Sequence, residues 1–255
     1  MAKQLIQADS TRVKSTEGIS PSNSIKISEF FMDTLQGEGF STGVPAAFLR
    51  VKDCTLNCTF CDSTSVWKYG NSYSFDELFQ MMEENGLIGQ LENGTHLVFT
   101  GGSPLRQQAQ LVKFMEEFID NYNFIPFIEV ENETVLTPSQ DMIDIVSQWN
   151  NSPKLENSGN KKAARYDSEV IKLMSELDNS WFKFVISEEN DWKEIEEDFI
   201  KPGLIYRDQI ILMPCGDTRE KLMLTRDIAV NMAIKEGVRY SDRLHTIIWN
   251  AKTGV

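Results

Sequence analysis

Short apolar runs alternate with amphipathic stretches along most of the chain. The runs with the length and composition of strands are AAFLRV (46–51), HLVFT (96–100), FIPFIEV (124–130), WFKFVI (181–186), QIILM (209–213) and LHTIIW (244–249). Between them, apolar residues recur at the spacing of one helix face, as in Phe75, Leu78, Phe79 and Met82 and again in Leu111, Phe114, Met115 and Phe118. Strands that alternate with helices favour parallel pairing through right-handed crossovers. The pattern predicts an α/β sheet of about six strands, open or curled into a partial barrel.

Capping residues predict two further helix starts. Thr137-Pro138-Ser139-Gln140 has the pattern of a capping box with proline at the first helical position, ahead of Ile143 and Val146. Asp217 and Glu220 have the same spacing ahead of another apolar stretch. Helices are therefore expected after both segments.

The domain organisation predicted from the sequence is simple. Residues 1–25 are rich in Ser, Thr, Lys and Gln, which is typical of a flexible N-terminal arm. Residues 26–255 suit a single domain with one core. Within it, the polar stretch 150–179 is interrupted by Pro153 and Gly159 and is interpreted as an insertion that carries a short helix at 168–177.

Composition narrows the function classes. Apolar residues make up 41% of the chain and charged residues 25%, as in ordinary globular proteins. No apolar run is long enough for a signal peptide or a membrane span, so we expect a cytoplasmic protein. The net charge of -13 argues against nucleic acid as a partner, because phosphate binding needs a basic surface. A small-molecule substrate is favoured.

Three of the four cysteines are clustered. Cys54, Cys58 and Cys61 form a CX3CX2C pattern directly after the predicted strand 46–51, while Cys215 is distant. A tetrahedral zinc site needs a fourth ligand, which the segment lacks. Three thiolates suit a 4Fe-4S cluster whose fourth iron stays open for a ligand. Two alternatives fit the same residues. One is a zinc site in which Cys215 is the fourth ligand, and the other is that the three thiols are simply buried and bind no metal.

The cysteine spacing, with an aromatic residue before the last cysteine, resembles the signature of radical S-adenosylmethionine enzymes. The resemblance implies that the open iron chelates the amino and carboxylate groups of S-adenosylmethionine. An electron from the reduced cluster then cleaves this molecule to a 5′-deoxyadenosyl radical.

Further segments resemble the 7-carboxy-7-deazaguanine synthases, the QueE family. The matching segments are 31–39 with its Gln-Gly-Glu-Gly, 45–50 with its Phe-Leu-Arg, Cys61-Asp62-Ser63, Thr-Gly-Gly-Ser-Pro-Leu (100–105), Glu-Val-Glu (129–131), Ser-Pro-Lys-Leu (152–155), Met-Pro-Cys-Gly (213–216) and 243–249. They span residues 29–255 discontinuously.

This resemblance implies an incomplete parallel (β/α) barrel of the radical S-adenosylmethionine type, with flanking helices. It implies a ring-contracting lyase that converts 6-carboxy-5,6,7,8-tetrahydropterin to 7-carboxy-7-deazaguanine, with loss of ammonia, in queuosine-type biosynthesis. The cofactors would be the 4Fe-4S cluster, S-adenosylmethionine and Mg²⁺. A homodimer and a reducing partner such as flavodoxin or ferredoxin are also implied.

The resemblance assigns roles to residues that match its motifs. Cys54, Cys58 and Cys61 would bind three irons, and Ser63 would offer a hydroxyl to Mg²⁺. The residues that would contact the pterin are Gln36, Glu38, Arg50, Glu131 and His245, with Glu131 and His245 as the catalytic pair. The residues that would approach S-adenosylmethionine are Gly101, Gly102, Ser103, Ser152 and Lys154.

Three departures from the family pattern stand out. Ser103 occupies a position where a glutamate commonly helps to hold the ammonium group of S-adenosylmethionine. Asn132-Glu133-Thr134 replaces Thr-Asn-Gly, and Lys52-Asp53 replaces a pair of small residues. Loss of a charge-assisted hydrogen bond at position 103 predicts weaker binding of S-adenosylmethionine.

Two other function classes fit the same cysteines. An activase that installs a glycyl radical on a partner protein shares the spacing but does not require the Gln-Gly-Glu-Gly segment, Arg50 or His245. A non-enzymatic iron-sulfur or zinc protein is the second, and Ser103 favours it if the loop has lost its role in catalysis.

Overall fold

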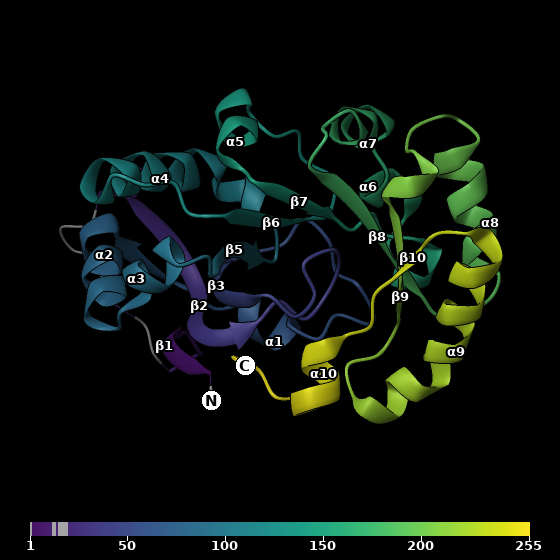
Figure 1. Cartoon of the computed structure of the whole chain (residues 1–255), viewed down its shortest axis with the longest axis horizontal. Coiled ribbons are helices and arrows are strands. Elements are labelled where there is room, and N and C mark those ends of the chain that lie inside the picture. The colour runs from purple at the N-terminus through teal and green to yellow at the C-terminus, as the bar shows by residue number, and fades with distance from the viewer. Residues whose placement is uncertain (1, 12–13, 15–19) are drawn as a thin grey trace.

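The computed structural model describes residues 2–11, 14 and 20–255. One ten-stranded sheet runs through the molecule (Figure 1). Its strands are β1 (Lys3–Gln7), β2 (Ser24–Leu35), β3 (Pro45–Val51), β4 (Asn71–Ser74), β5 (His96–Gly101), β6 (Ile128–Asn132), β7 (Gln148–Asn151), β8 (Ser180–Ile186), β9 (Ile210–Pro214) and β10 (Arg239–Tyr240).

The sheet is parallel over most of its width and does not close. Its order is β1-β2-β3-β5-β6-β7-β8-β9-β10, with β4 paired to β2. Every neighbouring pair from β3 to β10 is parallel, whereas β2 pairs antiparallel with β1, β3 and β4. The predicted α/β fold with an incomplete parallel barrel is therefore confirmed.

Helices connect the parallel strands and cover the sheet (Figure 1). They are α1 (Thr64–Trp67), α2 (Phe75–Glu84), α3 (Leu87–Glu92), α4 (Gln108–Tyr122), α5 (Gln140–Ile145), α6 (Lys162–Arg165), α7 (Ser168–Ser175), α8 (Asp191–Ile195), α9 (Arg219–Glu236) and α10 (Leu244–Trp249). A π-helical turn, Glu196–Ile200, continues α8. The helix predicted within the polar stretch corresponds to α7.

The predicted apolar faces of α2 and α4 form much of the core at one end of the sheet. Their residues are buried, and Phe79 of α2 stacks on Phe114 of α4 with ring centroids 4.9 Å apart. Helix α2 begins with a capping box: the Ser74 hydroxyl accepts from the Glu77 amide, and the Glu77 carboxylate accepts from the Ser74 amide. Local capping and tertiary burial thus favour the same helix.

The segment 244–249 was predicted as a strand, and this prediction is wrong. It forms helix α10, because the sheet already ends at β10, which pairs with β9. The Leu244 amide donates to the carbonyl of Gly37, and Thr246 is buried. A six-residue apolar run does not by itself distinguish a strand from a helix.

Other element boundaries also differ from the predictions. The run 124–130 becomes a strand only from Ile128, since Ile125 and Phe127 remain exposed. Helix α5 begins after Ser139, whose hydroxyl accepts from the Met142 amide, rather than at Pro138. Thr218, rather than Asp217, caps α9 by accepting from the Lys221 amide.

The flexible arm predicted for residues 1–25 is wrong for Lys3–Gln7. These residues form β1 along β2, and the Ile6 side chain is buried. The sequence did not predict this strand, because a single buried isoleucine among polar residues gives too weak a hydrophobic pattern. Residues 1, 12–13 and 15–19 of the predicted arm lie outside the described part of the chain.

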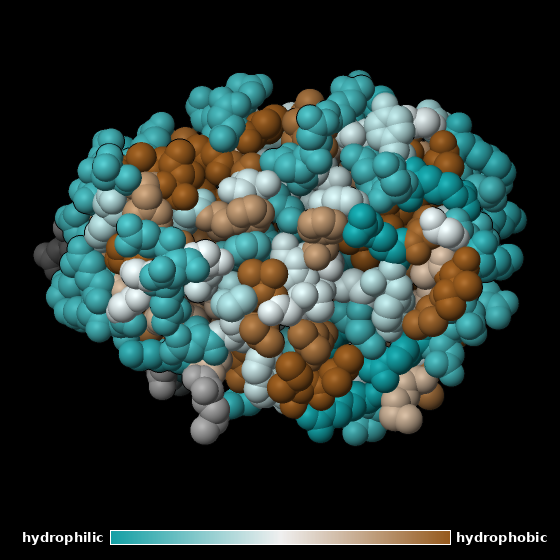
Figure 2. All heavy atoms as spheres, in the orientation of Figure 1, coloured by the Kyte–Doolittle hydropathy of each residue, from teal (hydrophilic) through white to brown (hydrophobic). Residues whose placement is uncertain are grey.

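Among the described residues, no helix is both long and apolar enough to span a lipid bilayer. Figure 2 shows a mostly hydrophilic rim with hydrophobic residues gathered over α10, where Ile248 is one of the exposed large side chains.

Candidate active site

A cavity of about 360 Å³ lies at the carboxyl ends of the parallel strands, within the usual size range of small-molecule sites. Parallel strands place these ends at one edge of the sheet, where α/β folds build their sites. The predicted site residues that line this cavity are Gln36, Glu38, Arg50, Cys54, Cys58, Cys61, Ser63, Gly101, Gly102, Glu131, Ser152, Lys154 and His245. Ser103 does not line it and is fully buried.

The loop after β3 presents the three clustered thiols to the cavity, each with an N–H donor at its sulfur. The Leu56 amide lies 3.4 Å from Cys54 Sγ, Asn160 Nδ2 lies 3.2 Å from Cys58 Sγ, and Trp67 Nε1 lies 3.5 Å from Cys61 Sγ. Burial raises the pKa of Cys54 and of Cys58, whereas hydrogen bonds outweigh burial and lower the pKa of Cys61. Such donors stabilise thiolate ligands and help to set the potential of an iron-sulfur cluster.

The spread of the sulfurs fits a cluster better than a single ion. A zinc ion holds each sulfur at about 2.3 Å, so neighbouring sulfurs lie within about 4 Å of one another. In the described part of the chain, the metal-binding side chains that gather within 4.8 Å are Glu38, Asp62 and His245, and not the three thiols. Cys215 is surrounded by Ser187, Arg243, Asp191 and Asp217 instead. The three thiols thus fit a 4Fe-4S cluster, and the alternative zinc site loses its fourth ligand.

At two positions only glycine fits, because another residue lies too close for a side chain. A Cβ on Gly102 would lie 2.0 Å from the carbonyl oxygen of Asp53, so this residue lets the β5 loop pack against the cysteine loop. A Cβ on Gly37 would lie 2.1 Å from Nδ1 of His245. Glycine at position 37 therefore makes room for the imidazole.

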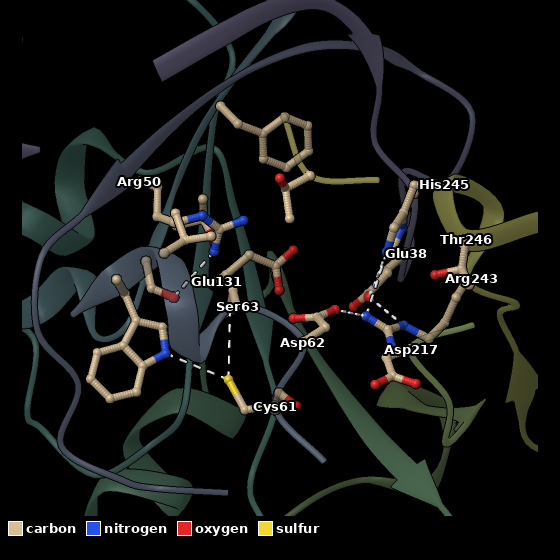
Figure 3. Close-up of a pocket in the computed structure, with 18 of the residues that line it drawn as sticks. Glu38, Arg50, Cys61, Asp62, Ser63, Glu131, Asp217, Arg243, His245 and Thr246 are labelled. Carbon is tan, nitrogen blue, oxygen red and sulfur yellow. Dashed lines mark hydrogen bonds and ion pairs between the residues drawn. The ribbon is translucent and has the colours of Figure 1, made fainter. Parts of the chain in front are cut away.

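A buried lysine is the centre of the charged network. Lys183 of β8 is 3% exposed, and its Nζ lies 2.6 Å from Glu38 Oε2 and 3.0 Å from Glu131 Oε2. Arg243 Nε donates to Glu38 Oε1 at 2.9 Å, and its Nη2 pairs with Asp62 (Figure 3). The network joins the loops after β2 and β3, the end of β6, the middle of β8 and the segment before α10.

The network sets different charge states for its acids. Burial would raise the pKa of Glu38, but Lys183 and Arg243 outweigh it and hold the pKa well below the usual value. Burial instead dominates at Glu131 and raises its pKa despite Lys183. Burial also lowers the pKa of His245, which is therefore neutral at pH 7. Glu38 is thus held as an anion, Glu131 gives up its proton less readily than an ordinary carboxyl group, and His245 binds a proton less readily than a free imidazole.

Arg50 and Gln36 are oriented by neighbouring acids. Arg50 Nε donates to the buried Glu29 at 3.1 Å, and its Nη1 lies 3.4 Å from the Gly101 carbonyl oxygen. Gln36 Nε2 lies 3.1 Å from Glu129 and 3.3 Å from Glu131. Gln36 is only 2% exposed, and its amide group helps to orient the Glu131 carboxylate as well as bordering the cavity.

The remaining predicted residues border the thiols. The Ser63 hydroxyl lies 3.7 Å from Cys61 Sγ (Figure 3). Lys154 Nζ donates to the Ser152 carbonyl at 2.6 Å and to its hydroxyl at 2.8 Å. The positive charge of Lys154 also acts on Cys54 and Cys58. Apart from Ser103, the residues predicted for the site thus lie around one cavity.

The sequence did not identify Lys183, Arg243, Asp62 and Glu133 as site residues. Lys183 carried a usable signal, since it is a charged residue inside the apolar run 181–186. Strand alternation turns it to the face opposite Phe182 and Phe184. Asp62 and Arg243 lie in segments that match the family motifs, but no role followed from the sequence, because their importance depends on contacts with elements distant in sequence.

Comparisons with known proteins now bear on this geometry. The model of a 4Fe-4S single cluster domain matches residues 35–145, which contain the three clustered cysteines. The 7-carboxy-7-deazaguanine synthase of Koribacter versatilis is 30% identical over 241 residues, covering 90% of this chain and 99% of that protein. The chain belongs to the 7-carboxy-7-deazaguanine synthase family. The synthase of Pyrobaculum aerophilum is 28% identical over 232 residues, covering 90% and 97% of the two chains.

A solved structure agrees with this family on the fold. QueE from Escherichia coli matches with a TM-score of 0.62 and 20% identity, over 87% of this chain and 95% of that one. The resemblance inferred from the sequence motifs is thus confirmed at the level of the family and its fold.

We expect Lys183→Met to lower the free energy of unfolding by about 2–4 kcal/mol at pH 7.5, because it leaves Glu131 buried without a cation. Arg243 still pairs with Glu38. Since the pKa of Glu131 is already raised, the folded variant binds a proton at higher pH than the unfolded chain does. Its loss of stability should therefore shrink as the pH falls towards 5.5. Urea unfolding at both pH values measures this.

The matched control is Lys201→Met, which removes an exposed lysine paired with Glu197 and should change stability at neither pH. A loss in Lys183→Met that is the same at both pH values would contradict the paired-charge explanation.

Proposed function

We propose that the protein is a 7-carboxy-7-deazaguanine synthase that converts 6-carboxy-5,6,7,8-tetrahydropterin to 7-carboxy-7-deazaguanine with release of ammonia. The observation that carries the proposal is the placement of a cysteine loop, Arg50 and an acid pair around Lys183 in one cavity. The names of the relatives support the same reaction.

The cysteine loop would hold the cluster. Cys54, Cys58 and Cys61 supply three thiolates, which leaves one iron of a 4Fe-4S cluster for S-adenosylmethionine. When bound, the reduced cluster and S-adenosylmethionine supply a 5′-deoxyadenosyl radical, and the protein supplies placement, charge and exclusion of water. Gly101, Ser152 and Lys154 border the space next to the thiols and would contact S-adenosylmethionine.

Arg50 would bind the carboxylate of the pterin. Its contacts with Glu29 and with the Gly101 carbonyl fix the plane of the guanidinium at the cavity wall. A planar guanidinium binds a carboxylate through two parallel hydrogen bonds. The carboxylate would thereby hold its ring carbon in a fixed position.

The acids would recognise the other end of the pterin. Glu131 would face the ring nitrogens and, because burial raises its pKa, is suited to hold a proton there. Gln36 and Glu38 border the same part of the cavity. Neutral His245 offers one donor and one acceptor to the substrate from the first turn of α10.

The remaining assignments rest on the family resemblance alone. Ser63 would provide an oxygen ligand to Mg²⁺, which prefers hard donors. The protein would work as a homodimer in the cytoplasm and receive electrons from a partner such as flavodoxin or ferredoxin.

The reaction itself is the first test. The anaerobically reconstituted protein is incubated with 6-carboxytetrahydropterin, S-adenosylmethionine, Mg²⁺ and dithionite, and products are followed by mass spectrometry. We expect 7-carboxy-7-deazaguanine at many turnovers per enzyme. Formation of 5′-deoxyadenosine alone would indicate a radical enzyme with another substrate. Neither product from protein with an intact cluster would favour the non-enzymatic iron-sulfur protein.

We expect Cys58→Ala to remove the cluster, because two thiolates hold it too weakly, and to abolish cleavage of S-adenosylmethionine. Iron and sulfide content and formation of 5′-deoxyadenosine measure both effects. Cys215→Ala is the matched control and should keep a full complement of iron, since Cys215 forms no close metal-ligand group with the other thiols among the described residues. Cleavage at the parent rate in Cys58→Ala would overturn the cluster assignment.

We expect Arg50→Lys to raise the KM for the pterin about ten-fold or more, because it loses one of two charge-assisted hydrogen bonds. The substitution keeps a positive charge beside Glu29, so the fold is not expected to suffer. Steady-state kinetics measure KM, with Arg207→Lys, an exposed site, as the control. An unchanged KM would show that Arg50 does not bind the carboxylate.

A further inference from the structure

Glu133 is a buried acid just beyond the end of β6, next to the cysteine loop. It is 6% exposed and lines the cavity. One carboxylate oxygen, Oε1, accepts from the Ser103 hydroxyl at 2.5 Å and from the Thr55 hydroxyl at 2.7 Å. The other, Oε2, is buried and has no hydrogen-bond partner among the described residues. A buried carboxylate with an unpaired oxygen is costly unless a cation reaches it.

The position of this unpaired oxygen is informative because the surroundings are anionic. Glu133 acts electrostatically on Cys54, and the Ser103 hydroxyl lies 3.7 Å from Cys54 Sγ. With three thiolates bound to a cluster, another negative charge beside them is unfavourable unless a ligand carries positive charge. S-adenosylmethionine carries such a charge on the ammonium group of its amino-acid end.

The small side chain at position 103 is compatible with an acid at position 133. The Ser103 side chain is fully buried, and its hydroxyl accepts from the Thr55 amide at 3.0 Å while donating to Glu133. A glutamate at position 103 would bring a second carboxylate against Glu133, and like charges at this distance oppose each other. The short serine leaves room for the Glu133 carboxylate. The two departures from the family pattern therefore amount to one change, in which the acid is at position 133 instead of position 103.

We propose that Glu133 supplies the carboxylate that binds the ammonium group of S-adenosylmethionine in this protein, in place of an acid at position 103. The inference rests on the proposed function, in which S-adenosylmethionine binds beside the cysteine loop. Ser103 and Thr55 are then positioning residues, which hold Oε1 and direct Oε2 towards the ligand. The weaker binding predicted from Ser103 alone is accordingly not expected.

Glu133→Gln isolates the charge. The glutamine oxygen still accepts from both hydroxyls, so the local hydrogen bonds are kept and only the negative charge is lost. We expect the dissociation constant for S-adenosylmethionine to rise about ten- to one-hundred-fold, the effect of one hydrogen bond between charged groups. The affinity for 5′-deoxyadenosine, which has no amino-acid end, should stay within about two-fold. Equilibrium dialysis with the reconstituted proteins, at equal iron content, measures both constants.

Two matched variants separate the charge from other effects. Asp217→Asn removes an acid from another part of the cavity wall, beside Cys215, and should leave both affinities near the parent values. Ser103→Ala removes one hydrogen bond to Glu133 but keeps the charge, and should weaken binding of S-adenosylmethionine less than Glu133→Gln does. An equal loss in Ser103→Ala would assign the effect to loop packing and overturn the proposal.

The remaining outcomes distinguish this proposal from the proposed function. If the parent protein binds S-adenosylmethionine and Glu133→Gln binds it equally well, the role of Glu133 is overturned and the proposed function stands. If Glu133→Gln weakens both ligands to the same degree, Glu133 shapes the nucleoside site and the proposal is again overturned. If the parent protein with its cluster does not bind S-adenosylmethionine, the proposed function fails as well.

Discussion

Parallel pairing from β3 to β9 is the constraint on which the site depends. It places the carboxyl ends of these strands at one edge of the sheet, so residues far apart in the sequence meet without any local signal between them. The cysteine loop follows β3, Gly101 ends β5, and Glu131 lies near the end of β6. Because the sheet stays open, the loop after β2 and helix α10 complete the cavity from the sides, with Glu38 and His245 respectively.

Buried charge is balanced differently in the two halves of the cavity. In the half that holds Glu38 and Glu131, the protein supplies its own cations through Lys183 and Arg243. In the half that holds the thiols, Glu133 keeps one oxygen unpaired, and Lys154 is the lysine that acts on the cysteines. The part of the cavity whose charges are neutralised suits a neutral ring that is recognised by hydrogen bonds. The part that keeps negative charge suits a cationic ligand. This division matches the two molecules that the proposed reaction brings together.

The contacts around Ser103 change how the family departures are interpreted. Considered separately, Ser103 is a position that lacks the glutamate common in the family, and Glu133 is an unusual residue after a strand. In the folded protein the two side chains are hydrogen-bonded, and both contact Thr55 of the cysteine loop. In the proposed arrangement, Glu133 in the loop after β6 compensates for the acid that is absent at position 103, because parallel strands bring the two loops to the same edge.

The sequence by itself determined the parts that depend on local pattern. Apolar spacing predicted α2 and α4, apolar runs predicted β3, β5, β8 and β9, and cysteine spacing predicted the cluster loop. It did not predict β1, β2, β4, β7 or β10, of which β1 and β7 are mostly polar. It assigned α10 to a strand because a short apolar run has no decisive period. Only the tertiary structure decided that Lys183 pairs with Glu38 and Glu131, that Gly37 leaves room for His245, and that Glu133 lies against Ser103. These contacts join residues separated by 30 or more positions in the sequence, and tertiary packing, not local propensity, fixes their distances.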